Sequence, residues 1–103
     1  MTYNRMKGLL SFLILWIIKK RKLTGMEITD ELEKRKGRKL SPGTIYPLLK
    51  KLKKDGLLEI DENKRYTLTE LGIKELKNRI GIFLKTFSDI DDMRNFIKKN
   101  ESL

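Results

Sequence analysis

The side chains in this sequence that can take part in binding chemistry are mainly amines and guanidinium groups. Lys and Arg account for 24 of the 103 residues against 14 Asp and Glu, which gives a formal net charge of +10. The positive charge is clustered, because residues 34–54 carry nine basic side chains and no acidic one. Such a cluster is the electrostatic footprint of a site for a polyanion. Its members are Lys34, Arg35, Lys36, Arg38, Lys39, Lys50, Lys51, Lys53 and Lys54.

Catalysis has few of its usual side chains here. The chain contains no Cys and no His, which excludes disulfides, thiolate or imidazole metal ligands, cysteine nucleophiles and histidine bases. An enzyme would depend on Lys or carboxylates in no recognisable arrangement, without a glycine loop for phosphate. We therefore expect no enzyme, no metal and no cofactor. The simplest alternative to a polyanion site is a lysine-rich surface, but skewed composition alone would scatter the charge.

Length and charge distribution favour one small domain with two unlike parts. A chain of 103 residues can form a single core that hides roughly two-thirds of the unfolded surface, and a second independent domain does not fit. Residues 1–68 hold 17 basic against 8 acidic side chains, a balance of +9. Residues 69–103 hold 7 against 6, a balance of +1. The sequence thus predicts a basic binding part followed by a near-neutral part.

The most apolar stretch is LLSFLILWII at residues 9–18, where Ser11 is the one polar residue. It is shorter than the roughly 20 residues that a membrane-spanning helix needs, and KKRK follows at residues 19–22. A signal peptide is the alternative, but no small-residue cleavage site follows the run. We expect a buried helix in a cytoplasmic protein. Trp16 is then expected in the core rather than in the wall of a ligand cavity.

The predicted elements follow the order helix, helix, helix, two-stranded hairpin, helix. LLEI and RYTL alternate apolar and polar residues around a polar tip, which predicts the hairpin. This order is typical of a winged helix-turn-helix, a mainly α fold with a small β part, in which the third helix enters the DNA major groove. The helices are predicted over about residues 7–20, 25–36, 42–55 and from 70 onward, with a short extended contact at Leu23. The expected capping and stop residues are Thr24, Gly37, Ser41, Gly56 and Thr69.

The third helix carries two prolines near its start. Pro42 fits the first helical position, where a missing N–H costs nothing. Pro47 lacks the N–H that would bond to the carbonyl of Gly43, so the lost hydrogen bond falls within the first two turns of the helix. On a helical wheel Pro47 lies opposite the apolar arc, so the prolines stiffen a face that points away from the core. We interpret this end of the helix as a docking end. The apolar arc is formed by Ile45, Leu48, Leu49 and Leu52.

Two motifs resemble the PadR family of transcriptional regulators. SPGTIYPLLKKLKKDGLLE at residues 41–59 is similar to the family's recognition helix, and KRYTLTELG at residues 64–72 is similar to its wing and the start of the next helix. ILWIIKKRKLTGMEI resembles the first two helices, with Met26 where an aromatic residue is common. The resemblance covers residues 7–80 and implies a winged-helix domain with dimerisation through the C-terminal helix. We therefore expect the DNA-binding core at residues 1–68 and the dimerisation region at residues 69–103. The resemblance also implies a homodimer, repression of a promoter, and release from DNA by a small hydrophobic ligand.

The predicted DNA-binding residues combine this resemblance with the charge pattern. The resemblance implies Ser41, Thr44, Tyr46, Lys50, Lys51, Lys64 and Arg65, and the charge pattern adds Arg38 and Lys54. Lysines act as point charges on phosphates, and hydroxyls with free N–H groups at the helix start can bond a phosphate oxygen. Tyr46 either packs the helix against the wing or bonds DNA through its hydroxyl. Lys50 either reads a guanine edge or contacts a phosphate.

The wing tip departs from the family pattern, because Asp61 and Glu62 stand where a basic tip is expected. Two acids at the tip would repel the DNA backbone, so deep insertion of the wing into the minor groove is not expected. Removal of either charge should tighten binding.

The C-terminal part shows an apolar residue at alternating steps of three and four, which is a heptad seam. We expect this seam to form a two-fold homodimer whose recognition helices fall roughly 34 Å apart on a pseudo-palindromic operator. The alternative is that the first helix of the same chain covers the seam, and both can hold. After the seam, Asp91 and Asp92 are expected to cap a separate short helix. The seam consists of Ile73, Leu76, Ile80, Phe83, Phe87 and Ile90.

With an enzyme not expected, two classes of function remain. The sequence favours a regulator that binds double-stranded DNA as a homodimer and represses transcription. The alternative is a winged-helix module that binds RNA or protein without recognising a duplex sequence. Selection from a random duplex pool separates these two, because only the first enriches a palindrome.

Overall fold

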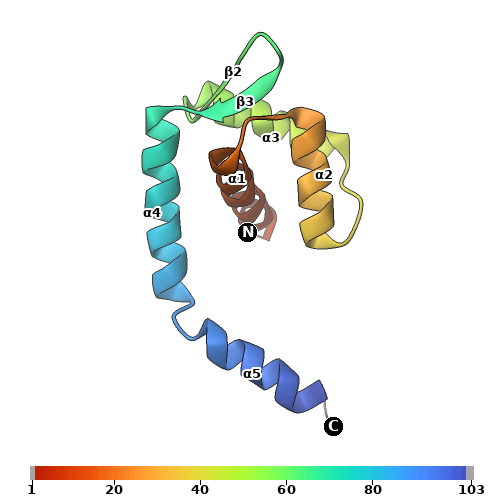
Figure 1. Ribbon diagram of the computed structural model, residues 1–103, viewed down its shortest axis with the longest axis vertical. Coiled ribbons are helices and arrows are strands. Elements are labelled where there is room, and N and C mark those ends of the chain that lie inside the picture. Colours follow the sequence, from red (N-terminus) through yellow and green to blue (C-terminus); the bar gives the residue numbers. More distant parts are fainter. Residues whose placement is uncertain (1, 102–103) are drawn as a thin grey trace.

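The computed structural model describes residues 2–101, with side chains described for residues 8–99. Helices and strands follow one another in the order that the sequence predicts, with one further strand (Figure 1). The first helix begins at Thr2 rather than near residue 7. The elements are α1 (Thr2–Lys20), β1 (Leu23–Thr24), α2 (Gly25–Lys36), α3 (Pro42–Lys54), β2 (Leu58–Ile60), β3 (Arg65–Leu68), α4 (Glu70–Thr86) and α5 (Ile90–Glu101).

The wing belongs to a three-stranded antiparallel sheet rather than to a two-stranded hairpin. Strands β2 and β3 form the predicted hairpin, with Ile60 paired to Tyr66. The segment expected as an extended contact is strand β1, where Leu23 pairs with Tyr66 from the other side. The order of the sheet is therefore β1-β3-β2. Because Leu23 is also buried in the core, β1 anchors the wing to the helical body.

One hydrophobic core joins α1, α2, α3 and the sheet. Its most deeply buried members include Ile14 and Leu15 of α1, Ile28 of α2 and Ile45 of α3. Most of the apolar run of α1 thus packs into the core, although Leu9 and Trp16 are exposed. No described helix is long and apolar enough to span a membrane.

Trp16 contradicts the expectation of a core residue. Its side chain is 37% exposed, and Lys20 Nζ lies 5.9 Å from the centroid of the ring. The physical reason is the helical period, which turns residue 16 about 200° away from the buried Ile14. Because α1 is apolar on nearly every side, composition alone did not indicate which face would meet the core.

The third helix has the predicted arrangement of prolines and leucines. Ser41 is the N-cap, and Pro42 occupies the first turn. Pro47 lies inside α3 and is exposed, whereas the predicted apolar arc is buried. At the other end Gly56 has φ +79°, and the Leu57 N–H donates to the carbonyl of Leu52 (3.0 Å). This is the hydrogen-bond pattern of a Schellman stop, which glycine favours.

A compact joint connects the end of α3 to the start of α4. The Thr69 hydroxyl donates to the carbonyl of Gly56 (2.5 Å) and accepts from the Gly72 N–H (3.0 Å). Any side chain at Gly72 would overlap the carbonyl oxygen of Leu57. The threonine and glycine of the LTELG motif are therefore required by packing at this joint.

The inner half of the C-terminal seam follows the alternative arrangement, in which the same chain covers it, and its outer end differs from the prediction. Its inner half is covered by the same chain, since Leu76 is buried and the rings of Phe83 and Phe12 lie 5.7 Å apart. The expectation of one helix through residue 90 is wrong: α4 ends at Thr86, because Phe87 leaves the helical conformation (φ −112°, ψ 46°).

The short helix α5 starts earlier than the predicted caps and leaves the body of the molecule. It begins at Ile90, so Asp91 and Asp92 lie in its first turn rather than before it. In Figure 1, α5 extends below the rest of the fold, away from the other helices. Its apolar side chains Met93 and Ile97 are exposed.

Candidate nucleic-acid interface

The predicted DNA-binding residues occupy α3, the loop before it and the wing. Arg38 lies in the loop between α2 and α3, and Lys64 and Arg65 lie at the end of the wing. All nine are exposed except Thr44, which is half-buried. Two shallow hollows bring members of the set together: Tyr46 and Lys64 border one, and three lysines of α3 border the other with Pro47. The three lysines are Lys50, Lys51 and Lys54.

The start of α3 uses amide groups that were expected to be free. The Ser41 hydroxyl oxygen accepts from the Gly43 N–H (3.1 Å), and the Thr44 N–H donates to the Ser41 carbonyl (2.9 Å). Pro42 has no N–H. Expecting open amides here was therefore wrong, because the capping bonds occupy those of Gly43 and Thr44. The hydroxyl protons of Ser41 and Thr44 are the donors that this end can present to a phosphate.

A hydrogen bond from α2 fixes the loop that carries Arg38. Glu33 Oε2 accepts from the Leu40 N–H at 2.7 Å. Gly37 ends α2 in the left-handed region with φ +70° and donates its N–H to the Glu33 carbonyl. Glu33 thus holds both ends of the loop through hydrogen bonds from backbone N–H groups. These bonds fix the direction in which the chain enters α3.

The three lysines on the outer side of α3 are not equivalent. Lys51 Nζ lies 3.2 Å from Asp55 Oδ2, one turn further along the helix. This pair is at the surface, where such contacts contribute little to stability, but the carboxylate offsets the charge of Lys51. No ion pair within the described part of the chain joins Lys50 or Lys54 to a carboxylate. Lys50 and Lys54 therefore present the stronger positive potential.

Tyr46 combines both of its expected roles in one position. Its ring packs on Gly25 at the start of α2, where a methyl group would lie 2.7 Å from Cε1. Even so, 47% of the residue is exposed. The neighbouring Tyr66 is partly buried, and burial first and Tyr46 second raise the pKa of its phenol. Tyr46 is thus a packing residue whose outer edge still faces solvent beside the wing.

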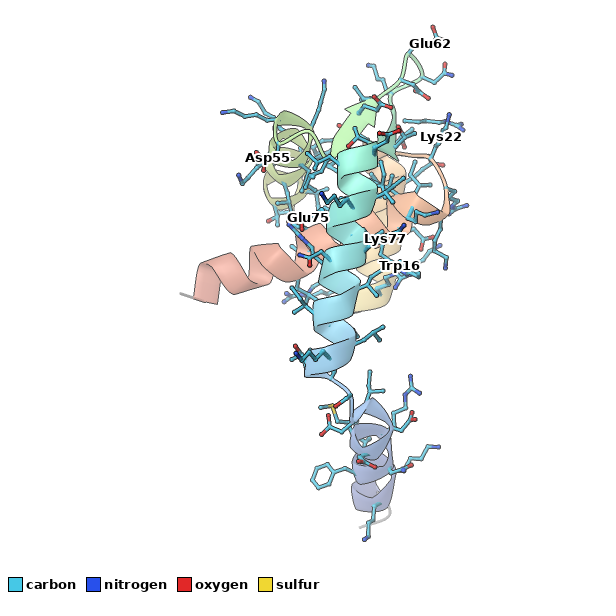
Figure 2. All side chains as sticks on the ribbon, turned by 90° about the vertical axis from the view of Figure 1, so that its left-hand side faces the viewer. Trp16, Lys22, Asp55, Glu62, Glu75 and Lys77 are labelled. Carbon is cyan, nitrogen blue, oxygen red and sulfur yellow. The ribbon has the colours of Figure 1, made fainter. Side chains whose placement is uncertain are left out.

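Asp61 shapes the wing turn in addition to placing a negative charge there. Its Oδ1 accepts from the N–H groups of Asn63 (2.9 Å) and Arg65 (3.0 Å), and its carbonyl accepts from the Lys64 N–H (3.0 Å). Lys64 has φ +61°, as in hairpins where a left-handed residue follows a type I turn. The bond from Arg65 is the main cause that lowers the pKa of Asp61. Glu62 stands at the far end of the wing (Figure 2).

Sequence reasoning missed the contribution of α2 to this surface. Met26, which is 70% exposed, borders the same hollow as Tyr46, Asn63 and Lys64. A capping box holds the start of α2 in place: the Glu27 N–H donates to Thr24 Oγ1 (3.2 Å), and the Thr24 N–H donates to Glu27 Oε1 (2.9 Å). The pattern Thr-x-x-Glu was the available signal for this rigid helix start.

A comparison of the sequence with profiles of protein families identifies the family to which this arrangement belongs. Residues 14–78 match the profile described as the transcriptional regulator PadR-like family. The chain belongs to this family. The match runs from α1 to the first half of α4 and includes the whole of the surface described above. A comparison with curated proteins found no significant match.

Solved structures share the fold of this PadR-like regulator over most of its length. A PadR-like transcription factor from Bacteroides fragilis has a TM-score of 0.69 at 26% identity, covering 93% of this chain and 96% of that chain. PadR of Bacillus subtilis in complex with p-coumaric acid has a TM-score of 0.63 at 34% identity, covering 69% of this chain and 43% of that one. RosR of H. salinarum has a TM-score of 0.70 at 23% identity, covering 90% and 92%, which shows the common fold.

Proposed function

We propose that this PadR-like regulator binds double-stranded DNA as a homodimer and represses transcription. The observation that carries the proposal is the division of α3 into two faces. Its apolar arc is buried, whereas Pro47, Lys50 and Lys54 lie exposed on the outer face. A rigid helix with a positive outer side, next to a wing, suits the major groove of a duplex.

The residues around α3 take different roles in this proposal. Lys54 and Arg38 neutralise phosphates, and the hydroxyls of Ser41 and Thr44 bond phosphate oxygens at the start of the helix. Lys50 faces the groove floor and reads a base edge. On the wing, Lys64 and Arg65 follow the backbone beside the groove. Tyr46 lies between helix and wing, where its exposed edge contacts a sugar or base.

A second copy of the chain is the proposed partner of the C-terminal helices. The 12 residues of α5 are too few for an isolated helix to be stable in water, so packing must support it. Met93 and Ile97 lie one turn apart and are exposed, as are Ile82 and Phe87 near the end of α4. Several large apolar side chains exposed on neighbouring helices are typical of an interaction site. Residues 69–103 are nearly neutral, so two copies can approach there without the repulsion of the basic parts.

A groove between α1 and α4 is the proposed place where assembly and ligand meet. It has a volume of about 430 Å³ and is lined by Leu9, Phe12, Ile82, Phe83 and Phe87, among others. Apolar grooves of this size accept either a small hydrophobic molecule or a partner helix. In the proposed dimer the partner's α5 covers this groove. A flat hydrophobic effector bound there would change how the two copies meet and release the DNA.

Selection from a pool of random duplexes tests the central proposal. The full-length protein should enrich a pseudo-palindrome whose half-sites lie about one helical turn apart. Uniform retention of all duplexes would reject sequence-specific binding and would favour the RNA-binding or protein-binding module. A scrambled duplex of equal length is the matched control. Affinity for the selected palindrome should also fall about a thousandfold or more between 50 and 200 mM salt.

A further inference from the structure

Four consecutive basic residues join α1 to β1, outside both the recognition helix and the wing. Lys19 and Lys20 end α1, and Arg21 and Lys22 lead into strand β1. All four side chains are exposed. We call residues 19–22 the basic turn. The sequence shows these residues only as the basic end of an apolar helix. None of them belongs to the DNA-binding surface described above.

The basic turn keeps most of its charge and has a defined shape. Lys20 lies over the ring of Trp16, and Arg21 Nη2 lies 3.4 Å from Glu31 Oε1. Glu31 is shared with Lys34, whose Nζ lies 3.9 Å away. It is the one carboxylate that forms an ion pair with the turn among the described residues. Four cations facing one shared acid leave a patch with a strong positive potential.

Two further carboxylates that feel the charge of the turn are committed to backbone groups. Glu27 Oε1 accepts from the Thr24 N–H, and Asp61 Oδ1 accepts from two amides of the wing. These bonds are the main causes of the lowered pKa of each acid, and charges from the turn add to them: Arg21 for Glu27 and Lys22 for Asp61. Lys22 therefore lies within electrostatic reach of Asp61 in the wing turn.

The sheet places the basic turn on the far side of the wing from α3. In the order β1-β3-β2, strand β1 is the edge next to the turn, while α3 packs against β2. Figure 2 shows the same arrangement, with Asp55 at the end of α3 on one side and Lys22 on the other, and the wing between them. The basic turn is thus placed to meet DNA that extends past the wing.

We infer that the basic turn is a second phosphate-binding site, which holds the DNA that flanks each half-site beyond the wing. Its contacts do not depend on the DNA sequence, because lysine and arginine side chains outside the groove meet backbone phosphates rather than base edges. The inference rests on the proposed function, since it assigns the turn to the same duplex. It extends the footprint of the regulator outward without adding any base recognition.

The test compares two duplexes that share one selected palindrome. The first ends at the palindrome, and the second carries ten further base pairs of scrambled sequence on each side. For the wild-type protein the flanks should tighten binding about tenfold and steepen the salt slope by roughly two to four. The double variant Lys19→Gln/Lys22→Gln leaves Arg21 and Lys20 in their contacts. It should bind the short duplex like wild type and gain little from the flanks.

Control variants and footprinting separate the outcomes. Lys74→Gln/Lys77→Gln removes the same charge from exposed positions of α4 and should keep the full gain from the flanks. Hydroxyl-radical footprinting of the wild-type protein should show protection of the flanking DNA backbone. This measurement uses no variant, so it does not depend on how any variant folds. Equal binding of both duplexes by wild type would overturn the inference while leaving the proposed function intact, and so would an equal loss on both duplexes in the double variant. Failure to enrich any palindrome would remove both.

Discussion

The ring of Tyr46 on α3 lies directly against the backbone of Gly25, the first residue of α2. A methyl group at residue 25 would sit 2.7 Å from Cε1 and 3.2 Å from the hydroxyl oxygen of the tyrosine. Such a distance is shorter than van der Waals contact, so the ring occupies space that exists because residue 25 has no side chain. Gly25 thereby sets the position of a tyrosine that we assign to DNA contact.

Gly25→Ala should displace this ring and weaken binding to the selected palindrome more than binding to scrambled DNA. The added methyl group introduces overpacking, which typically costs about 1–3 kcal/mol when the ring cannot move. In the Tyr46→Ala background the same substitution should have no further effect on palindrome binding. Fluorescence anisotropy on the four proteins of this cycle measures the coupling. Additive losses would show that Gly25 does not act through Tyr46.

The control for this cycle is Gly81→Ala in α4. A methyl group there meets no atom within 4 Å. Replacement of an exposed helical glycine by alanine should raise the free energy of unfolding by roughly 0.5–1 kcal/mol. Its DNA binding should equal that of wild type.

The two acids at the tip of the wing should respond in opposite directions. Glu62→Gln should tighten DNA binding, because it removes a negative charge from the end of the wing without touching a described hydrogen bond. Asp61→Ala should weaken binding, because the amides of Asn63 and Arg65 lose their acceptor and the turn that holds Lys64 loosens. Anisotropy titrations on one palindromic duplex compare them. Tightening by both variants would mean that charge at the wing matters more than its shape.

The wing turn should survive mild acid. Hydrogen bonds from Arg65 and Asn63 hold the pKa of Asp61 below its ordinary value of 3.8. Because the folded pKa is depressed, the stabilising contribution is present above the unfolded value and is lost as the pH falls through the folded pKa. The amide chemical shifts of Asn63 and Arg65 should therefore titrate with a midpoint below 3.8, and Asp61→Asn should abolish this transition. A midpoint above that value would contradict the hydrogen bonds described here.

The lysines of α3 should separate into two classes. Lys54→Ala should weaken binding to every duplex alike and lower the salt slope by about one, as expected for a phosphate contact. Lys50→Ala should also relax the preference at one base position. Lys51→Ala should have the smallest effect of the three, since Asp55 already offsets its charge. Selection repeated with each variant measures base preference, and identical profiles for Lys50→Ala and Lys54→Ala would assign Lys50 to the backbone.

Charges placed on the apolar side of α5 should dissociate the dimer. Met93→Asp/Ile97→Asp puts two carboxylates on neighbouring turns of the face that we assign to the partner. The full-length variant should sediment as a monomer at micromolar concentration and lose affinity for the palindrome. Asn95→Asp, on the opposite side of the same helix, is the matched control and should remain dimeric. A wild-type chain that sediments as a monomer would itself refute the dimer.

Local signals carried most of what could be predicted about the fold. Thr24 and Ser41 were predictable as caps and Gly37 and Gly56 as stops, because each depends on backbone groups a few residues away. The burial of the arc containing Ile45 followed from one helical wheel. These features need no knowledge of what packs against the element, and the structure confirms them.

Features that depend on distant neighbours were not predictable. Trp16 is outside the core because the partners of α1 lie on its other side. The end of α4 at Thr86 carries neither proline nor glycine, so the apolar spacing ran on across the break to Ile90. The sequence suggests a repulsive role for Asp61 because of its charge. An Asp in a turn can equally accept a hydrogen bond from the backbone N–H two residues further on, which is the role that Asp61 has toward Asn63. Which interpretation held depended on the three-dimensional course of the wing.

Thr69 has a further consequence for how the regulator measures DNA. One hydroxyl ties the last turn after α3 to the first turn of α4, and Gly72 rests on the Leu57 carbonyl with no room between them. The joint therefore leaves no room between these two elements, and we expect a tilt of α4 to move the end of α3 with it. In the proposed dimer, which is joined through the C-terminal helices, the angle between the two copies sets the distance between their two recognition helices. The spacing of the half-sites is then encoded in the geometry of a joint that touches no DNA.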